Sequence, residues 1–191
     1  MKAIKFFTLL MLFSGIVTST SFAQRGRIDI FKDLKPGQWV DIAGAPQKSG
    51  PLLTEKVKVV TGDLQADDCE VKGVVTGIDP EKKMIFLHGL KISTTDDTEY
   101  EADEPGGPAF TKFAHLKVDQ LIEAEGIYLK NGSFKALEVE NESYSPKAAK
   151  NRKLISLVGK VQKVNPSNRT IQVMNLTFKI TENTKLRRRF Q

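Results

Sequence analysis

The sequence has few of the residues that build catalytic and metal sites. It contains one cysteine, Cys69, and two histidines, His88 and His115. A lone cysteine cannot form an internal disulfide, so the fold must be stabilised by burial of apolar side chains. The histidines occur in neither the H-x-H nor the H-E-x-x-H spacing of transition-metal sites, and no G-x-S-x-G or glycine-rich phosphate loop is present. The sequence therefore predicts a protein that is not an enzyme, with no catalytic residues and no cofactor.

A strong charge excess and a high aromatic content are also missing. The chain has 29 Lys+Arg against 23 Asp+Glu, and aromatic residues make up 8% of it. Proteins that bind single-stranded nucleic acid interleave basic residues with several aromatic platforms. The composition therefore argues against a nucleic-acid partner.

Long apolar runs are absent except at the N-terminus. Lys2 and Lys5 precede a run over residues 6–17, and small polar residues then lead to Ala23. This order of charged, apolar and small residues is typical of a signal peptide. A membrane anchor is the less favoured alternative, because a spanning helix needs about 20 apolar residues. We expect a signal peptide over residues 1–23, a periplasmic or secreted bacterial protein, and no transmembrane segment in the mature chain.

The chain contains two internal repeats. Residues 70–100 align with residues 156–186 without a gap at an offset of 86, and the two segments share a glycine, a turn proline and two threonines. Apolar and polar residues alternate in both segments, which predicts short strands on either side of the proline turn. In the first copy these include a strand at 84–87, and residues 90–93 either continue it or start a third strand. We call this unit the front half.

The second repeat has a different pattern. Residues 31–59 align with residues 113–141 without a gap at an offset of 82. The first residues of each copy suit a helical turn, and a hairpin follows. In the second copy the predicted strands are 120–128 and 134–140, joined around Asn131-Gly132, a dipeptide that favours hairpin turns because both residues tolerate positive φ. We call this unit the back half.

A front half followed by a back half has the element order of an OB-fold, a five-stranded Greek-key barrel. The sequence therefore predicts an all-β protein made of two small OB-like barrels. Residues 69–142 form one complete barrel, and residues 143–154 are a linker. The half-repeats 28–62 and 155–186 each lack the other half, and our hypothesis is that they pair to form the second barrel. Pairing between subunits, or a longer architecture of which this chain is the front, remain alternatives.

The repeated residues also indicate a family. The pattern G-x-V-x-x-I/V-D/N-P, followed by T-x-x-T, F-x-x-L-K-x-x-Q and G-x-x-x-K-x-G, resembles an exported bacterial repeat family, the domain of unknown function numbered fifty-six sixty-six. The resemblance covers about residues 28–186. It implies small OB-like β domains, often in tandem, and it brings no catalytic residues.

The OB-like topology predicts where a ligand would bind. OB-folds use the face of strands two and three and the adjoining loops. That surface would serve either of two functions, a module that binds or scaffolds an envelope protein or polymer, or a periplasmic protein that binds a small ligand or oligosaccharide. The oligomeric state is left open by the sequence. The candidate ligand-binding residues are Lys82, Lys83, Phe86, His88, Tyr128 and Lys130.

Two charged segments lie outside this surface. The acidic run over residues 96–104 offers oxygen ligands, and Asp96, Asp97 and Glu99 are weak candidates for a Ca²⁺ site. Their spacing is not that of an EF-hand, so a solvated loop is the favoured interpretation. The basic run over residues 187–189 could contact anionic lipid headgroups or polymer, but a solvated, frayed terminus is the favoured interpretation.

Overall fold

The computed structural model describes residues 30–102 and 108–188, and the predicted signal peptide lies outside these ranges. The prediction of an all-β protein is confirmed. No helix of the described residues is long and apolar enough to span a membrane. The helical elements are α1 (Ile30–Asp33), η1 (Phe113–His115) and α2 (Ala148–Asn151). The strands are β1 (Trp39–Ala45), β2 (Leu52–Val59), β3 (Cys69–Val74), β4 (Gly77–Asp79), β5 (Met84–Leu87), β6 (Leu90–Ser93), β7 (Glu99–Ala102), β8 (Leu121–Tyr128), β9 (Phe134–Asn141), β10 (Ile155–Asn165), β11 (Thr170–Val173), β12 (Leu176–Lys179) and β13 (Lys185–Arg188).

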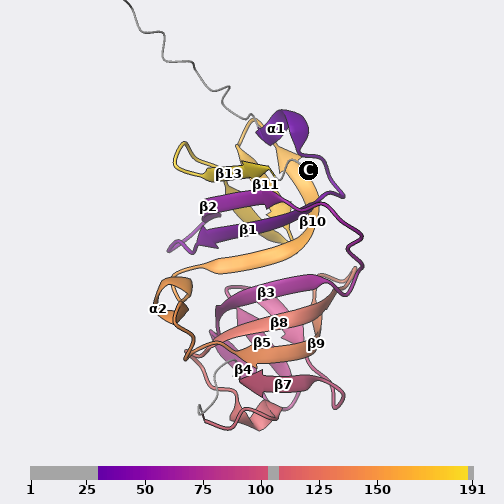
Figure 1. Ribbon diagram of the computed structural model, residues 1–191, viewed down its shortest axis with the longest axis vertical. Coiled ribbons are helices and arrows are strands. Elements are labelled where there is room, and N and C mark those ends of the chain that lie inside the picture. The colour runs from indigo at the N-terminus through magenta and orange to yellow at the C-terminus, as the bar shows by residue number, and fades with distance from the viewer. Residues whose placement is uncertain (1–29, 103–107, 189–191) are drawn as a thin grey trace, which may run out of the picture.

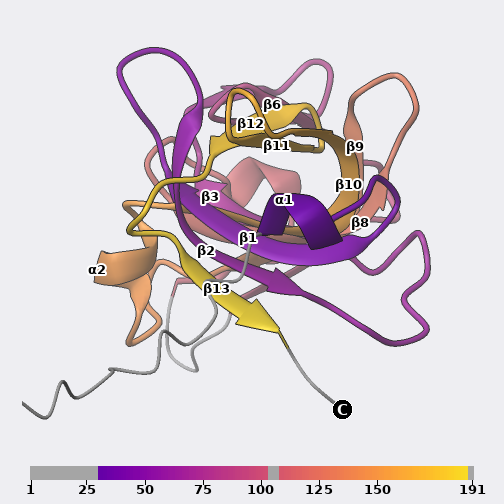
Figure 2. The same ribbon diagram turned by 90° about the horizontal axis from the view of Figure 1, so that it is seen from above.

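Five strands from the two ends of the described chain close into a barrel. β1 pairs with both β2 and β10, β10 pairs with β11, β11 pairs with β12, and β12 returns in parallel to β2. The N-terminal hairpin and the C-terminal strands therefore lie side by side. Helix α1 lies across the mouth of this ring (Figure 2), where Ile30 and Leu34 are buried in the core.

The remaining strands continue the same sheet. β3 pairs with β8, β8 with β9, β9 with β6, β6 with β5 and β5 with β4. Only Val75 and Thr76 separate β3 from β4, and their N–H groups donate to the carbonyl oxygens of Gln120 (2.8 Å) and Phe86 (2.8 Å). The two sets of strands meet where β3 runs antiparallel to β10 (Figure 1), so residues 155–158 join both parts of the molecule.

Apolar side chains fill the inside of both strand sets. Phe178 and Ile171 are fully buried in the first set, and Phe134 and Ile85 are fully buried in the second. Burial of each such side chain contributes about 1.5–3 kcal/mol. The free thiol of Cys69 is buried in this core, and burial raises its pKa. Apolar packing therefore takes the place of disulfides, as a chain with a single cysteine requires.

A threonine turn directs the chain into each of the two outermost strands. The Thr98 hydroxyl accepts from the Thr95 N–H (2.9 Å) and donates to the Ala136 carbonyl (3.0 Å). The repeated T-x-x-T makes the same contacts at Thr184, whose hydroxyl donates to the Thr54 carbonyl (2.9 Å). These bonds hold β7 against β9 and β13 against β2, both in parallel.

These outermost strands differ from the interpretation of the sequence. The acidic run does not remain a solvated loop throughout, because residues 99–102 form β7. The basic run is not a frayed terminus at Arg187 and Arg188, because β13 extends through these residues. Each strand buries one residue, Tyr100 or Leu186, against the core, and that contact outweighs the cost of ordering a charged segment. The predicted linker also contains a short helix, α2.

The hairpin between β8 and β9 forms as predicted, but its turn is different. Gly132 has a φ of +86°, whereas Asn131 does not adopt positive φ. The Asn131 Oδ1 atom instead accepts from the Ser133 N–H (3.0 Å), which holds a longer loop. The glycine is therefore the residue that the left-handed conformation requires.

Candidate binding face

One continuous outer sheet runs along the molecule. Its strands follow the spatial order β13, β2, β1, β10, β3, β8, β9, β7, as Figure 1 shows on the side facing the viewer. The seam between β10 and β3 has four strands on each side of it. Because side chains alternate across a strand, every second residue points outward from this sheet.

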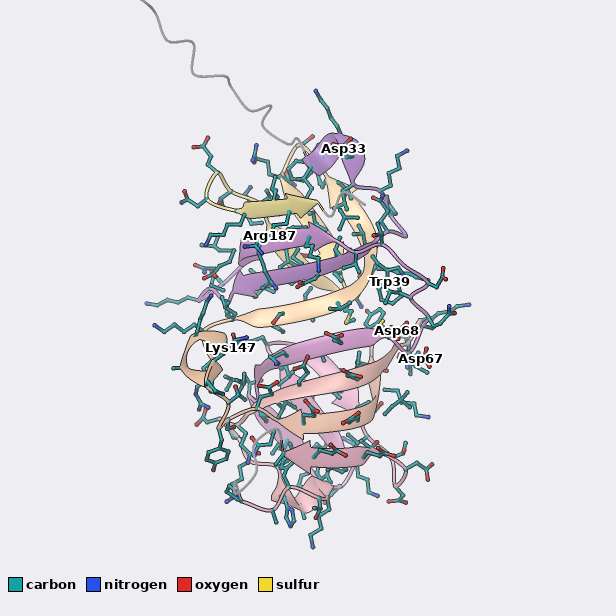
Figure 3. All side chains as sticks on the ribbon, in the orientation of Figure 1. Asp33, Trp39, Asp67, Asp68, Lys147 and Arg187 are labelled. Carbon is teal, nitrogen blue, oxygen red and sulfur yellow. The ribbon has the colours of Figure 1, made fainter. Side chains whose placement is uncertain are left out.

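The outward residues of β3, β8, β9 and β7 form what we call the acidic half. Directly paired residues point to the same side of a sheet, so the register places carboxylates next to one another across all four strands. Figure 3 shows their oxygens along these strands. One row contains Glu70, Glu125, Glu138 and Glu99, and the other contains Lys72, Glu123, Glu140 and Glu101.

The outward residues of β13, β2, β1 and β10 form the basic half. Arg187 pairs with Lys58, and Lys185 pairs with Lys56, so four cations lie on two neighbouring strands. Asp41 is the acid in these rows, and it accepts from Lys56 Nζ (3.0 Å). The other residues of these two rows are uncharged: Ala43, Ser156 and Val158. The outer sheet is therefore positive at one end and negative at the other.

The two halves occupy equivalent positions in the repeats and carry opposite charges. At the offset of 86, Glu99 matches Lys185 and Glu101 matches Arg187. At the offset of 82, the acids of β9 match the lysines of β2: Glu138 with Lys56 and Glu140 with Lys58. Sequence reasoning missed this face because it compared only the residues that the repeats share. The charge reversals in the same alignments are the signal that finds it.

Carboxylates of the acidic half repel one another. Partial burial raises the pKa of Glu70, and the neighbouring Glu125 and Asp41 raise it further. Partial burial and the charges of Glu101 and Glu125 raise the pKa of Glu138. Burial is the largest cause of both shifts, and repulsion between neighbouring carboxylates adds to it. A cation that binds over this surface would stabilise the ionised carboxylates and so lower these pKa values.

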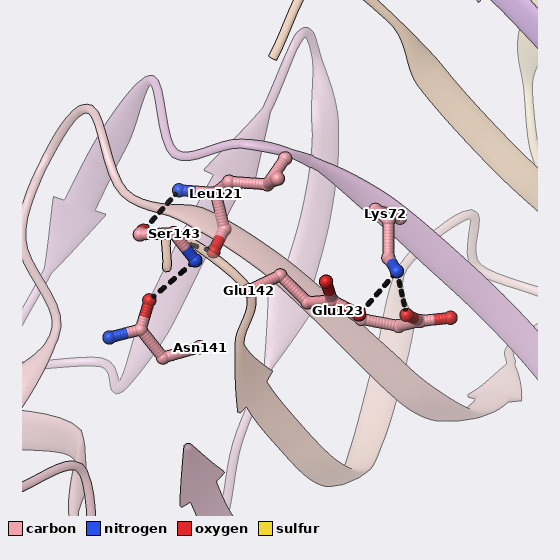
Figure 4. A network of polar contacts seen from close by, with 6 residues as sticks. All are labelled: Lys72, Leu121, Glu123, Asn141, Glu142 and Ser143. Atoms are coloured by element: carbon pink, nitrogen blue, oxygen red, sulfur yellow. Dashed lines mark hydrogen bonds and ion pairs between the residues drawn. The ribbon is translucent and has the colours of Figure 1, made fainter. Parts of the chain in front are cut away.

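Lys72 is the cation in the two paired rows of the acidic half. Its Nζ atom forms ion pairs with Glu123 and Glu142, as Figure 4 shows. Burial opposes the charge on Lys72, but the hydrogen bonds to the two carboxylates raise its pKa. Burial also raises the pKa of Glu123 to about 7. Burial raises the pKa of Glu142 as well, but its hydrogen bonds, led by the one from Lys72, and the charge of Lys72 together lower it. One ammonium therefore balances two carboxylates that share a half-buried site.

The chain beyond β9 fixes Glu142 in this network. The Ser143 hydroxyl accepts from the Leu121 N–H (2.9 Å), and the Ser143 N–H donates to Asn141 Oδ1 (3.1 Å) (Figure 4). The Glu142 N–H donates to the Leu121 carbonyl (2.9 Å). These bonds hold the backbone of Glu142 beside Lys72, with which its side chain forms the ion pair.

Three of the predicted ligand-binding residues lie around β5. Lys82 forms an ion pair with Asp79 (3.3 Å) in the turn before this strand. Lys83 forms an ion pair with Asp96, and the hydrogen bond between them lowers the pKa of Asp96. Phe86 lies opposite Gly77 across the β4–β5 pair. Both lysines are thus engaged by carboxylates of their own chain.

The other three are more widely spaced. His88 lines an open cleft of about 580 Å³ with the loop between β1 and β2, and burial lowers its pKa. Lys83 borders a different hollow, near Tyr100. Tyr128 packs against the core, and Lys130 is exposed in the β8–β9 loop. His88 is therefore the one predicted residue that lines the cleft.

The weak metal candidates Asp96, Asp97 and Glu99 do not converge in the part of the chain that the structure describes. Asp96 pairs with Lys83, the Asp97 N–H donates to Thr95 Oγ1 (3.3 Å), and Glu99 lies on β7. The carboxylates that do approach one another belong to the acidic half and its neighbour Glu142: Glu101 with Glu138 and Glu140, and Glu123 with Glu140 and Glu142.

The fold and this face define a small all-β protein with a closed five-stranded barrel and a charged outer sheet. Residues 72–140 match the sequence model of one family, described as Domain of unknown function (DUF5666). This match confirms, for residues 72–140, the family resemblance inferred from the sequence. Comparison with curated proteins and with solved structures gave no match.

Proposed function

We propose that the mature chain is an exported, non-enzymatic binding module of the cell envelope, and that its acidic half docks a positively charged partner. The separation of charge along the outer sheet carries this proposal. Seven glutamates and a single lysine make up the two paired rows of the acidic half, and this lysine, Lys72, is already bound to Glu123 and Glu142. Export, inferred from the leader, places such a partner in the envelope.

Electrostatic complementarity explains how this face selects a partner. Opposite charges accelerate encounter and reject partners of the same sign, and both effects weaken as salt screens the charges. The raised pKa values of Glu70 and Glu138 favour a cationic partner over an anionic one, because a cation relieves their mutual repulsion. The face is a docking surface rather than a reaction site.

A fluorescent oligolysine peptide tests this proposal. We expect the mature chain at nanomolar concentration to bind the peptide, with the affinity falling about tenfold or more between about 0.05 and 0.3 M salt. The double variant Glu99→Lys with Glu138→Lys is expected to weaken binding at least tenfold. Glu81→Lys with Glu182→Lys changes the charge equally in two exposed turns and serves as the control. Equal weakening by both variants, or no binding at all, would contradict the proposal.

The cleft beside His88 supports a second candidate, binding of a neutral oligosaccharide. Its lining is uncharged apart from the histidine and combines apolar with amide and hydroxyl side chains, which suits the faces and hydroxyl groups of a sugar. The lining residues are Pro46, Gln47, Gly50, Pro51, Leu52, His88, Asn175, Leu176 and Thr177.

Thermal unfolding with neutral oligosaccharides tests this second candidate. A bound sugar at about 100 times its Kd is expected to raise Tm by about 5–10 °C. His88→Ala should remove most of that rise, whereas Gln65→Ala, in an exposed turn elsewhere, should keep it. A rise that survives His88→Ala places the sugar outside the cleft.

A further inference from the structure

We infer that the positively charged partner of the acidic half is the basic half of a second copy of this chain. This inference rests on the proposed function and names its partner. The two copies would stack their outer sheets face to face about a two-fold axis at the β10–β3 seam. The order of the strands in one copy would then be the reverse of the order in the other. A two-fold interface is self-complementary, so a face that is positive at one end and negative at the other satisfies it with a single surface.

The strand order determines which residues meet. With the axis parallel to the strands at the seam, β13 of one copy lies over β7 of the other, and β2 lies over β9. In the first row Arg187 then faces Glu99, and Lys58 faces Glu138. In the second row Lys185 faces Glu101 and Lys56 faces Glu140, as the register requires. The two-fold axis generates each of these four opposite-charge pairs a second time, with the roles of the two copies exchanged.

The centre of the face is compatible with this arrangement. At the seam, Val158 faces Glu70 and Ser156 faces Lys72, so small or uncharged side chains oppose charged ones. Asp41 faces Glu125, which is the one contact between like charges in the two rows. The ion pair between Asp41 and Lys56 of the same copy reduces this repulsion. A stack with the same strand order in both copies would instead place the acidic half of one copy on the acidic half of the other, over four strands. The charges therefore favour the arrangement in which the strand order is reversed between the two copies.

The repeat explains why one surface has this property. The duplicated units place β13 and β2 at positions equivalent to β7 and β9, and the four charge reversals make the two ends of the sheet opposite in sign. Two copies of an unchanged repeat would carry the same charge at both ends and would repel. Charge reversal after duplication converts a repelling face into a self-associating one.

Sedimentation of the mature chain, residues 24–191, measures the association. We expect a dimer in about 0.02 M salt that dissociates in about 0.5 M salt, where charges are screened within a few ångströms. Lys58→Glu with Arg187→Glu makes both ends acidic, and Glu99→Lys with Glu138→Lys makes both ends basic. Each variant alone should weaken the dimer at least tenfold.

Mixing the two variants gives the decisive result. The doubly acidic and the doubly basic chains are complementary at both ends, so equal amounts should form a heterodimer at least as tight as the wild-type dimer. Lys91→Glu with Lys163→Glu makes the same charge change at two exposed positions outside the two rows, and should leave the dimer intact. Two monomeric variants that stay monomeric when mixed would overturn the inference.

The outcomes separate this inference from the proposed function. A wild-type chain that is monomeric at low salt but binds oligolysine through the acidic half overturns the dimer and leaves the cationic partner standing. A chain that neither associates nor binds the peptide overturns both. A dimer that persists in about 0.5 M salt and in both variants uses another surface and also contradicts the inference.

Discussion

Replacing Gly126 by alanine is expected to destabilise the protein by about 3–5 kcal/mol, as measured by urea unfolding. Gly126 has a φ of +157° at a bulge in β8, a conformation that costs an L-residue energy. A Cβ atom there would lie 2.1 Å from the carbonyl oxygen of Lys135 and 3.0 Å from the Cα atom of Ala136. Both atoms belong to the backbone of β9, so the neighbouring strand itself would have to move.

Gly50→Ala separates strain from crowding in this prediction. Gly50 has a φ of +88°, and no atom lies within 4 Å of the Cβ that alanine would add. Its replacement should cost only about 1 kcal/mol, from the left-handed backbone alone. If Gly126→Ala costs no more than Gly50→Ala, β9 yields to the added methyl group and the contact at the bulge is not as restrictive as the geometry indicates.

The same glycine shows how far the sequence predicts the fold. Gly44 and Gly126 match in the repeat, and each stands at a register shift in the first strand of its hairpin. Turn and core residues recur because their local geometry recurs, and that geometry depends on neighbours close in the chain. The strand at 84–87 was therefore predicted with the bounds that the structure has.

The outermost strands depend on contacts that are distant in the chain. β7 pairs in parallel with β9, and β13 with β2, so their partners are set by the three-dimensional fold. Their sequences carry mainly charge, which a single sequence read locally assigns to solvent. The one local signal is an inward Tyr100 or Leu186 two residues after the second threonine of T-x-x-T.

The candidate face was missed for the same reason. Glu70, Glu125 and Glu138 are separated by loops and lie next to one another only through the register of three strands. His88, in contrast, was predicted from the position of its turn in an OB-like unit, and the structure places it in a cleft. Positions within a unit are predictable from local sequence, whereas charge gathered across units becomes visible only when the charge reversals between the repeats are compared.

Replacing Lys72 by methionine is expected to cost about 3–5 kcal/mol at pH 8, because removing one partner leaves charged groups uncompensated in a half-buried site. Methionine keeps the length and the apolar stem of the lysine, so the change removes the charge with little loss of packing. Glu123 and Glu142 would then face each other without a cation between them. Lys135→Met, at a half-buried lysine on β9 outside this network, is the control and should cost less than about 1 kcal/mol.

The pH dependence of this loss identifies its cause. The pKa of Glu123 in the folded protein, about 7, lies above its ordinary 4.5, so the folded state holds more protons between these values and stability falls as the pH rises through them. Without Lys72 the pKa of Glu142 also rises, so Lys72→Met should lose clearly more at pH 8 than at pH 5, where the carboxyl groups are protonated. A loss that is equal at both pH values would instead assign the effect to packing.

Glu123→Gln provides the opposite change at the same site. A neutral amide removes the cost of burying the second carboxylate and leaves Lys72 paired with Glu142 alone. We expect stability at pH 8 to rise by about 1–2 kcal/mol, after allowance for the partial exposure of the group, and the decline between pH 5 and pH 8 to flatten. Adding Glu123→Gln to Lys72→Met should restore part of the lost stability, since a single carboxylate then remains. If the amide lowers stability at pH 8, the ionised Glu123 contributes more through its bond to Lys72 than its burial costs, and the network stabilises the pairing of β3 with β8.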